Sequence, residues 1–570
     1  MLKNLYRQVL ILLITLSSTA SFAQNKEFLE FINKDHQWVD SIYESLTNKE
    51  RIAQLFLVRS HTNLGQGYID SVQRVIKKEK LGGLVVFQGG PNAHVNMFNN
   101  YQQSSDIPLL ISFDGEWGLG MRMADSTLSF PFQLTLGAVQ NNELIYQMGK
   151  QIASEFKRMG MHFNFAPVVD INNNPKNPVI GFRSFGDDKY KVTEKAGAYM
   201  QGMMDGGILT SIKHFPGHGD TDVDSHFDLP QLNFSRERLD TLELYPFKEL
   251  IAKGAQSVMV GHMHVPVIDD TPNIPTSISE KAIQELLINE LGFRGLVVTD
   301  AMDMDGVKKN FPSGQSELMA YKAGVDLIEV SADSEKAIKL IENSIQTGET
   351  SEELLAKKVK KVLATKLWLE LHKQNQIETV GLYEDLNSEA TKKLVDSLAL
   401  QATTLLNSKK LIEEFNKDVS TAIVQVGGDS MQSFEKQMLK NTSNSKFYHI
   451  SEELTKSELK KLLKETRRHP QIVLAIHDTG LRPRPSYIIE SKEINNFVAK
   501  LAGKRTISVL FSNPYTLNNL PVKRSKSILM GYQNDPFMQK AVGKILINKI
   551  PTQGKLPVNI NKKYKNGMGL

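Results

Sequence analysis

The sequence contains no cysteine in its 570 residues. This absence excludes disulfide bonds, thiolate metal sites, a cysteine nucleophile and a lipid-modified N-terminal cysteine. The stability of the folded chain must therefore come from hydrophobic cores, which a chain of this length is able to bury.

Charge of one sign is also scarce. The 68 Lys and Arg residues nearly balance the 63 Asp and Glu residues, so the formal net charge is only +5. No dense basic patch with interleaved aromatic residues is present, and we do not expect a nucleic acid partner. Hydrophobic residues make up 41% of the chain and charged residues 23%, as is usual for a soluble globular protein. Internal repeats and low-complexity tracts are absent.

Long hydrophobic runs are missing except at the N-terminus, where residues 1–23 have the pattern of a signal peptide. Lys3 and Arg7 precede a short apolar core at Val9–Ile14, and Ser21–Ala23 offers small residues for cleavage. The core is too short to span a bilayer, although an N-terminal anchor is the alternative reading. We expect export to the periplasm or medium, cleavage near Ala23, and no stable membrane insertion.

Residues 24–371 alternate between short apolar runs and amphipathic helical patterns. Eight such runs within about three hundred residues predict a parallel (β/α)8 TIM barrel, and an open doubly wound sheet is the alternative. The candidate strands are Ile52–Val58, Gly83–Phe87, Leu109–Phe113, Phe163–Val168, Leu209–Lys213, Ser257–Gly261, Leu296–Asp300 and Asp326–Val330.

A second alternation predicts a smaller C-terminal α/β sandwich domain at residues 390–570. A Lys-rich closing helix, Glu352–Leu371, ends the barrel, and residues 372–389 read as a linker. Gly427-Gly428 lacks the Lys and Ser/Thr of a phosphate loop and reads as a turn. The candidate strands are Thr421–Val426, Ile472–Ile476, Ile507–Phe511 and Ser527–Met530.

Polar residues gather where the barrel strands end. In a (β/α)8 barrel these positions face one mouth, where active sites form. They are Asp114, Glu116, Asp170, Lys213, His214, His262, His264, Asp300 and Glu329.

The segment Ile212–Pro230 is a polar loop that contains three histidines and follows a strand. Within it, Asp224 stands two residues before His226, so its carboxylate can accept a hydrogen bond from one ring nitrogen and leave the other for acid or base chemistry. The alternative is an uncoupled polar turn. The Asp spacing is also typical of calcium loops, but Ser225 and Gln231 occupy positions where such loops need Gly and Glu.

Asp300 ends an apolar strand, where a carboxylate is costly unless it is used or paired. It is either a nucleophile or base, or the N-cap of a following helix. His262 and His264 with Asp300 offer an alternative metal site. A further set of side chains could bind a sugar. The Asp114 carboxylate could accept hydrogen bonds from two sugar hydroxyls, and donors to sugar hydroxyls or to an amide carbonyl are available on Arg122, Arg183, Lys213 and His214.

Six sequence blocks in order resemble the glycoside hydrolase family 3 β-N-acetylglucosaminidases, from about residue 40 to the end. After Glu116 the family usually has a Gly pair, where this chain has Trp117-Gly118. The blocks are Phe113–Glu116, Gly181–Gly186, Lys213–Thr221, Asp224–His226, Val298–Met302 and Gly554–Val558.

The resemblance implies a retaining exo-β-N-acetylglucosaminidase that releases non-reducing N-acetylglucosamine from peptidoglycan fragments. Asp300 matches the nucleophile, His226 the acid/base catalyst and Asp224 its orienting partner. The resemblance implies no cofactor and no metal, a glycan as the only partner, and no protein partner. The matched substrate-binding positions are Asp114, Arg122, Arg183, Lys213 and His214.

Two other functions stay open from the residues, namely a metal-dependent barrel hydrolase and a non-catalytic protein that binds cell-wall glycans. The resemblance also leaves open a glycoside phosphorylase of the same family.

Overall fold

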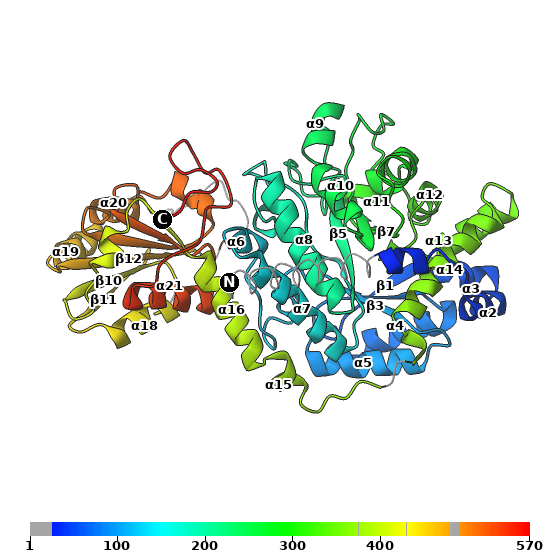
Figure 1. Cartoon of the computed structure of the whole chain (residues 1–570), viewed down its shortest axis with the longest axis horizontal. Helices are drawn as coiled ribbons and strands as arrows, with labels where there is room; N and C mark the ends of the chain where they lie inside the picture. The colour runs from blue at the N-terminus through cyan, green and yellow to red at the C-terminus, as the bar shows by residue number, and fades with distance from the viewer. Residues whose placement is uncertain (1–25, 374–375, 429, 479, 481–490) are drawn as a thin grey trace, which may run out of the picture. The chain divides into compact units, whose positions relative to one another are not determined.

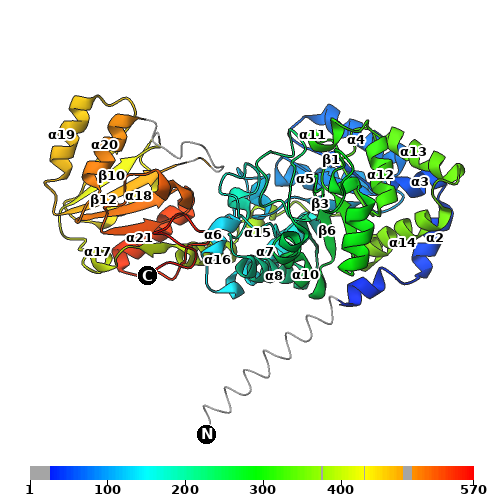
Figure 2. The same cartoon turned by 90° about the horizontal axis from the view of Figure 1, so that it is seen from above.

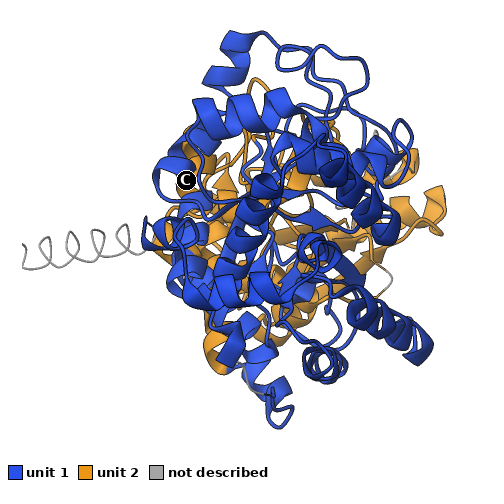
Figure 3. Ribbon diagram, turned by 90° about the vertical axis from the view of Figure 1, so that its right-hand side faces the viewer, with its two compact units in different colours: residues 1–129, 146–170, 196–388 blue, residues 130–145, 171–195, 389–570 orange. Residues whose placement is uncertain are grey.

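The computed structural model describes residues 26–373, 376–428, 430–478, 480 and 491–570. The predicted signal peptide, residues 1–23, lies outside them. The described residues form two compact units (Figure 3). Unit 1 comprises residues up to 129, 146–170 and 196–388, and unit 2 comprises residues 130–145, 171–195 and 389–570. Among the described residues, no helix is long and apolar enough to cross a membrane.

Unit 1 contains an eight-stranded parallel barrel surrounded by helices (Figures 1 and 2). The strands pair in the order β7-β6-β5-β4-β3-β2-β1-β8, and a parallel bridge between Val298 and Leu327 joins the remaining edges. The (β/α)8 prediction is therefore confirmed, and the open doubly wound sheet is wrong. The strands are β1 (Phe56–Ser60), β2 (Gly83–Val86), β3 (Leu110–Phe113), β4 (Phe163–Asn164), β5 (Leu209–Phe215), β6 (Ser257–Val260), β7 (Leu296–Thr299) and β8 (Ile328–Glu329).

The strands read as continuous apolar runs because both of their faces are covered. Every residue of β2, β3, β6 and β7 is buried, as expected when side chains fill a barrel and helices coat it. The helices that lie wholly in unit 1 are α2 (Gln37–Ser45), α3 (Asn48–Ala53), α4 (Gln66–Glu79), α5 (Pro91–Gln103), α9 (Arg236–Thr241), α10 (Tyr245–Ala252), α11 (Asp305–Lys308), α12 (Gln315–Ala323), α13 (Ser334–Gln346), α14 (Glu352–Trp368) and α15 (Leu382–Leu386), with the π-helix η4 (Lys281–Glu290) and the 3-10 turns η1 (Leu119–Met121), η3 (Thr276–Ile278) and η5 (Leu371–Lys373).

The first predicted strand, Ile52–Val58, was placed too early in the chain. Residues 48–53 form α3, and β1 begins only at Phe56. Thr47 and Glu50 form a capping box, in which each side chain accepts a hydrogen bond from the backbone N–H of the other residue. This arrangement satisfies two N–H groups that a helix end otherwise leaves unpaired, so it favours a helical turn there.

Unit 2 is an α/β sandwich around a six-stranded sheet, as predicted. The sheet order is β11-β10-β12-β13-β14-β9, in which only β9 is antiparallel to its neighbour. Helices α19 and α20 cover one face, and α18 and α21 cover the other (Figure 1). The strands are β9 (Thr404–Leu406), β10 (Thr421–Val426), β11 (Lys446–Ile450), β12 (Gln471–His477), β13 (Thr506–Phe511) and β14 (Ser527–Met530). The helices are α6 (Gln133–Gly137), α16 (Glu389–Ala402), α17 (Lys410–Glu413), α18 (Ser433–Asn441), α19 (Lys456–Thr466), α20 (Lys492–Leu501) and α21 (Pro536–Asn548), with the 3-10 turns η2 (Gly181–Arg183) and η6 (Pro514–Asn518).

Two segments that the sequence placed in the barrel domain pack within unit 2. Phe132 N and Thr135 Oγ1 both donate to Gln533 Oε1, at 2.9 and 2.7 Å. Asp187 Oδ2 accepts the backbone N–H of Asn559 at 2.6 Å. Helices α7 (Asn142–Met159) and α8 (Lys189–Asp205) start in unit 2 and end in unit 1. Unit 2 is thus discontinuous in sequence, whereas the predicted domain boundaries assumed one continuous barrel segment.

The predicted linker, residues 372–389, contains α15 and contacts α7 within unit 1. Arg158 donates to Asp385 Oδ2 at 2.7 Å and to the carbonyl oxygens of Glu378 and Val380 at 2.6 and 2.8 Å. Leu382 is buried. The described part of this segment is therefore anchored, and the exact domain boundaries stay a prediction.

A buried lysine in α14 predicts an unusual dependence of stability on pH. Lys366 is fully buried, donates to Gln54 Oε1 at 2.7 Å, and burial lowers its pKa to about 7. An unfolded lysine titrates near 10.4, so the unfolded state binds more protons than the folded state between these values, and stability rises with pH across this window. Lys366→Met removes this slope.

We expect the stability advantage of Lys366→Met over the wild type to shrink by roughly 1 kcal/mol per pH unit from about pH 7 to about pH 10. Urea unfolding across that range measures it. Lys357→Met, at an exposed position of the same helix, is the control and should show no such trend. A pH-independent difference at Lys366 would contradict the prediction.

Candidate active site

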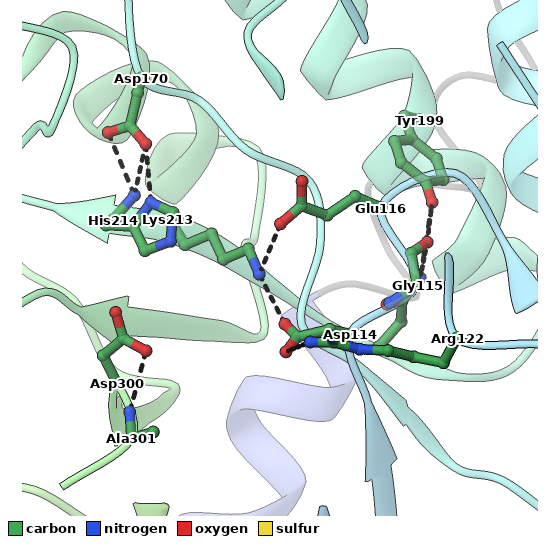
Figure 4. A network of polar contacts seen from close by, with 11 residues as sticks. Asp114, Gly115, Glu116, Arg122, Asp170, Tyr199, Lys213, His214, Asp300 and Ala301 are labelled. Carbon is green, nitrogen blue, oxygen red and sulfur yellow. Dashed lines mark hydrogen bonds and ion pairs between the residues drawn. The ribbon is translucent and has the colours of Figure 1, made fainter. Parts of the chain in front are cut away.

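Strand β5 delivers Lys213 and His214 to the barrel mouth. Its register against β6 shifts between Ile212 and Phe215, so that one extra residue is accommodated where these two side chains lie. Such a bulge re-aims side chains at the end of a strand. Lys213 Nζ donates to Asp114 Oδ1 at 2.7 Å and pairs with Glu116 Oε1 at 3.0 Å (Figure 4). The lysine is thereby fixed between the two carboxylates that follow β3.

Asp114 is held by two cations, one on each oxygen. Lys213 contacts Oδ1, and Arg122 Nη2 donates to Oδ2 at 3.0 Å (Figure 4). The Arg122 guanidinium also lies 4.8 Å from the centre of the Phe87 ring, a cation–π contact that fixes its orientation. The structure therefore pairs Asp114 with Arg122, although Trp117 interrupts the usual family pattern between them.

The backbone between Asp114 and Glu116 is fixed from unit 1. Gly115 N donates to Asn164 Oδ1 at 2.9 Å. Figure 4 shows that Tyr199 Oη donates to Gly115 O, at the same distance. A Cβ at Gly115 would lie 2.8 Å from the Phe156 ring, so a glycine is needed here. Asp114, Lys213 and Arg122 together are called the clamp below, and its carboxylate, Asp114, stands on a rigid turn.

Asp170 anchors the long loop, a role that the sequence did not reveal. It is almost fully buried and accepts hydrogen bonds from His214 N, from His214 Nδ1 at 2.7 Å and from His218 N at 2.7 Å. Burial alone would raise the pKa of Asp170, but the charge and hydrogen bonds of the two histidines hold it below its usual value. One carboxylate thus shapes both the strand end and the start of the loop.

Replacing this anchor should destabilise the protein. Asp170→Asn leaves one carbonyl acceptor for three N–H groups, so we expect the free energy of unfolding to fall by about 2–4 kcal/mol near neutral pH. The wild-type pKa is depressed, so this advantage exists above about pH 4 and disappears as the pH falls through the lower folded value. Urea unfolding at several pH values measures it. Asp106→Asn, at an exposed position, is the control, and equal small losses in both variants would contradict the anchoring role.

Asp300 follows β7 and is not a helix cap. Its Oδ1 accepts the N–H of Ala301 at 2.9 Å, whereas the next helix, α11, begins only at Asp305 with Met304 as its N-cap. The N-cap interpretation is therefore wrong. Burial acts to raise the pKa of Asp300, but three histidines and the Ala301 N–H lower it below its usual value. The histidines are His214, His226 and His262. Asp300 is thus a carboxylate at neutral pH.

Asp224 and His226 form the predicted dyad. Asp224 Oδ1 accepts hydrogen bonds from His226 Nδ1 at 2.7 Å and from His226 N at 3.0 Å. The Asp224 side chain is 10% exposed and the His226 side chain 53% exposed. The carboxylate favours the tautomer that carries its proton on Nδ1. The uncoupled-turn interpretation is wrong.

The other loop histidine, His218, has a structural place. Its Nδ1 contacts Thr221 Oγ1 at 2.8 Å and its Nε2 contacts Ser225 Oγ at 3.1 Å, both within the same loop. Because each ring nitrogen is engaged and the side chain is buried, His218 supports the loop that carries His226.

The donor set does not fit the alternative metal site. His262 Nε2 donates to Ala301 O at 3.0 Å, so its Nδ1 accepts the Ser277 hydroxyl at 2.7 Å and no nitrogen lone pair remains for a metal. Burial lowers the pKa of His262. Within the described ranges, no group of three or more metal-binding side chains gathers. The metal-dependent hydrolase is not supported.

The structure brings most predicted site residues to one mouth. Figure 4 shows Asp114 joined to Arg122 and Lys213, with His214 and Asp300 drawn in the same part of the barrel. The exception is Arg183, which lies in η2 of unit 2, so its role in substrate binding stays a prediction. The sequence places Glu329 at the end of a predicted strand but indicates no function for it.

Comparisons with known proteins agree with this geometry. The family described as "Glycosyl hydrolase family 3 N terminal domain" matches residues 47–365. Beta-hexosaminidase A of Pseudoalteromonas piscicida is 30% identical over 364 residues, which cover 58% of this chain and only 60% of that relative. A Cellulomonas fimi protein named beta-N-acetylglucosaminidase/beta-glucosidase is 25% identical over 92% of this chain and 95% of its own length.

A solved structure supports the same assignment. The glycoside hydrolase family 3 β-N-acetylglucosaminidase from Paenibacillus sp. str. FPU-7 has a TM-score of 0.75 and 29% identity, covering 90% of this chain and 99% of its own. The family match itself spans more than half of the chain. The chain therefore belongs to glycosyl hydrolase family 3 and is a glycoside hydrolase of that family.

Proposed function

We propose that the protein is a retaining exo-β-N-acetylglucosaminidase in which Asp300 is the nucleophile and His226 the acid/base catalyst. One observation carries the proposal. The loop that carries the dyad of Asp224 and His226 packs against the segment that follows Asp300, since Gly306 N donates to Ser225 O at 3.2 Å. A nucleophile and a proton donor in one place are what a two-step displacement needs.

The proposed reaction has two balanced steps. First, a carboxylate oxygen of Asp300 bonds to the anomeric carbon while the glycosidic bond breaks, and His226 gives its proton to the leaving oxygen. Second, neutral His226 takes a proton from water, the water oxygen bonds to the anomeric carbon, and the ester to Asp300 breaks. Two inversions retain the anomeric configuration. Asp224 stabilises the ring in its protonated form, before the first step and again after the second.

The substrate assignment rests on relatives and on the clamp. Relatives named beta-hexosaminidase and beta-N-acetylglucosaminidase match this chain, which supports N-acetylglucosamine as the sugar. The proposal of peptidoglycan fragments as its source rests on the family resemblance alone. Asp114 offers acceptors to sugar hydroxyls, while Arg122, Arg183, Lys213 and His214 offer donors to hydroxyls or to the acetamido carbonyl.

A panel of nitrophenyl β-glycosides tests reaction and sugar together. We expect the β-N-acetylglucosaminide to be cleaved fastest, with the β-anomer of the free sugar released first. Products with and without phosphate separate hydrolysis from phosphorolysis, since a sugar 1-phosphate would indicate the phosphorylase. An α-anomer formed first would reject the retaining mechanism. Binding of N-acetylglucosamine without turnover of any glycoside would favour the non-catalytic glycan-binding protein.

We further propose that the enzyme is exported, to the periplasm or medium. The support is the sequence of residues 1–23, in which Lys3 and Arg7 precede an apolar core and Ala23 ends a cleavage motif. N-terminal sequencing of the protein from cell fractions tests this. Cleavage near Ala23 in an extracytoplasmic fraction is expected, and an intact N-terminus in the cytoplasm would contradict it.

A further inference from the structure

The carboxyl group of Glu329 is buried, and one of its two oxygens has no hydrogen-bond partner among the described residues. It ends β8, pairs in register with Leu57 of β1, and is only 2% exposed. Its Oε2 is buried and makes no hydrogen bond to any of the described residues. Buried polar atoms are nearly always satisfied, so an exception in a barrel mouth indicates a group that meets its partner in a bound ligand.

The neighbours of Glu329 place it near the barrel axis. Charges that act on it come from Arg59 in β1, Asp114 after β3, Lys213 in β5 and Asp300 after β7. These groups belong to four alternate strands of the barrel. A side chain of β8 that lies near all four must point into the mouth, among the proposed nucleophile and the clamp.

Neither nearby cation pairs with this carboxyl. Lys213 gives its Nζ to Asp114 and Glu116, at 2.7 and 3.0 Å. Arg59 gives both Nη atoms to Asp303, at 2.9 and 3.1 Å. Burial therefore raises the pKa of Glu329 well above its usual value, and the charges of Asp114 and Asp300 raise it further against the opposing effect of the two cations. Both effects favour the protonated form of Glu329.

The backbone beside Glu329 is also held in an unfavourable conformation. Val330 has a φ of 47°, in the left-handed region that β-branched residues rarely adopt. Its N–H donates to Leu57 O at 2.9 Å, and Glu329 O accepts the N–H of Met302 at 2.9 Å. Strained residues persist where the surrounding structure and function require them. Here the turn fixes the end of β8 against the segment that follows Asp300.

We propose that Glu329 is a substrate-binding residue whose carboxyl O–H donates a hydrogen bond to an oxygen of the sugar held in the barrel mouth. The assignment rests on the proposed function for the identity of that sugar. An ionised carboxylate only accepts hydrogen bonds, whereas a protonated one can donate. The neutral acid thus supplies a donor without a third negative charge beside Asp300 and Asp114.

The test compares two neutral replacements of similar length. Glu329→Gln keeps an N–H donor, and we expect its kcat/KM to stay within about threefold of the wild type. Glu329→Met removes the donor and should lose about 10- to 100-fold, the range for an unpaired polar group of the ligand. Glu335→Gln and Glu335→Met, at an exposed site of α13, are the matched controls and should not change activity. Equal activity of Glu329→Met and the wild type, or equal losses in both Glu329 variants, would overturn the proposal.

Infrared difference spectroscopy gives a readout that needs no turnover. At neutral pH, the wild type should show the carbonyl band of a protonated carboxyl group that is absent from Glu329→Gln and that shifts when N-acetylglucosamine is added. A missing band, or one that no panel sugar shifts, would overturn the role of Glu329. If the wild type cleaves a different glycoside, the proposed sugar is wrong, and the kinetic and infrared comparisons are made with that sugar.

Discussion

Asp300→Ala is expected to reduce kcat/KM by at least about 10⁴-fold while the protein stays folded. The loss follows because alanine has no oxygen that could bond to the anomeric carbon in place of the Asp300 carboxylate. Loss of fold is not expected, since Asp300 is partly exposed at the barrel mouth and packs little apolar surface.

Turnover of the nitrophenyl β-N-acetylglucosaminide measures the effect, and thermal unfolding checks the fold. A slow fluorosugar should trap a covalent adduct on Asp300 in the wild type, which peptide mass spectrometry locates. Asp305→Asn is the matched control, because Asp305 is a nearby carboxylate that pairs with Lys308. An adduct on another residue, or a nearly normal kcat in Asp300→Ala, would remove Asp300 from the nucleophile role.

His226→Ala should slow substrates with poor leaving groups by about 10²- to 10⁴-fold and activated aryl glycosides far less. An activated leaving group departs without a proton, so the loss of the acid matters little to it. Asp224→Ala should give the same pattern more weakly, because it removes only the partner of Nδ1 at 2.7 Å. An unperturbed histidine side chain has a pKa of about 6.5, which is closer to a neutral working pH than the pKa of an unperturbed carboxyl group.

The measurement is kcat/KM across aryl leaving groups of graded pKa. Asp222→Ala is the matched control, since Asp222 is an exposed aspartate that lies two positions before Asp224 in the same loop. It should leave the dependence on leaving group unchanged. Equal losses on all leaving groups in His226→Ala would refute its acid role. His218 would not then be the substitute, since hydroxyl groups engage both of its ring nitrogens.

The fold was predictable where one physical signal dominated. Barrel strands such as Leu296–Thr299 are buried on both faces and read as plain apolar runs. The prediction failed where two sequence signals competed, or where a strand was too short or too polar to be recognised. Ile52 and Ala53 look like strand residues, but the capping box at Thr47 and Glu50 makes them helical. Strand β11 has partly exposed, polar residues such as Lys446 and His449, and β9 has only three residues, so neither produced a recognisable run.

The residues of the site also differ in how far the sequence alone predicts their contacts. Asp224 and His226 were predictable as a pair because they are two residues apart, and their hydrogen bond is local. Asp170 lies 44 residues before His214 in the chain, so no spacing in the sequence reports their contact. Glu329 was visible at a strand end, but the raised pKa of its carboxyl group depends on burial and on charges from four other strands, which only the folded barrel brings together.

The discontinuity of unit 2 limits how this protein can be cut or assembled. A chain truncated after Ser388 would retain residues 130–145 and 171–195 but lose their partners, including Gln533 and Asn559. Phe130 and Leu136, which are buried in the whole chain, would lie in a segment without its companion layer. During synthesis these two segments leave the ribosome hundreds of residues before the strands that complete their unit. We therefore expect that removal of the C-terminal third would leave these two segments unable to form their native contacts.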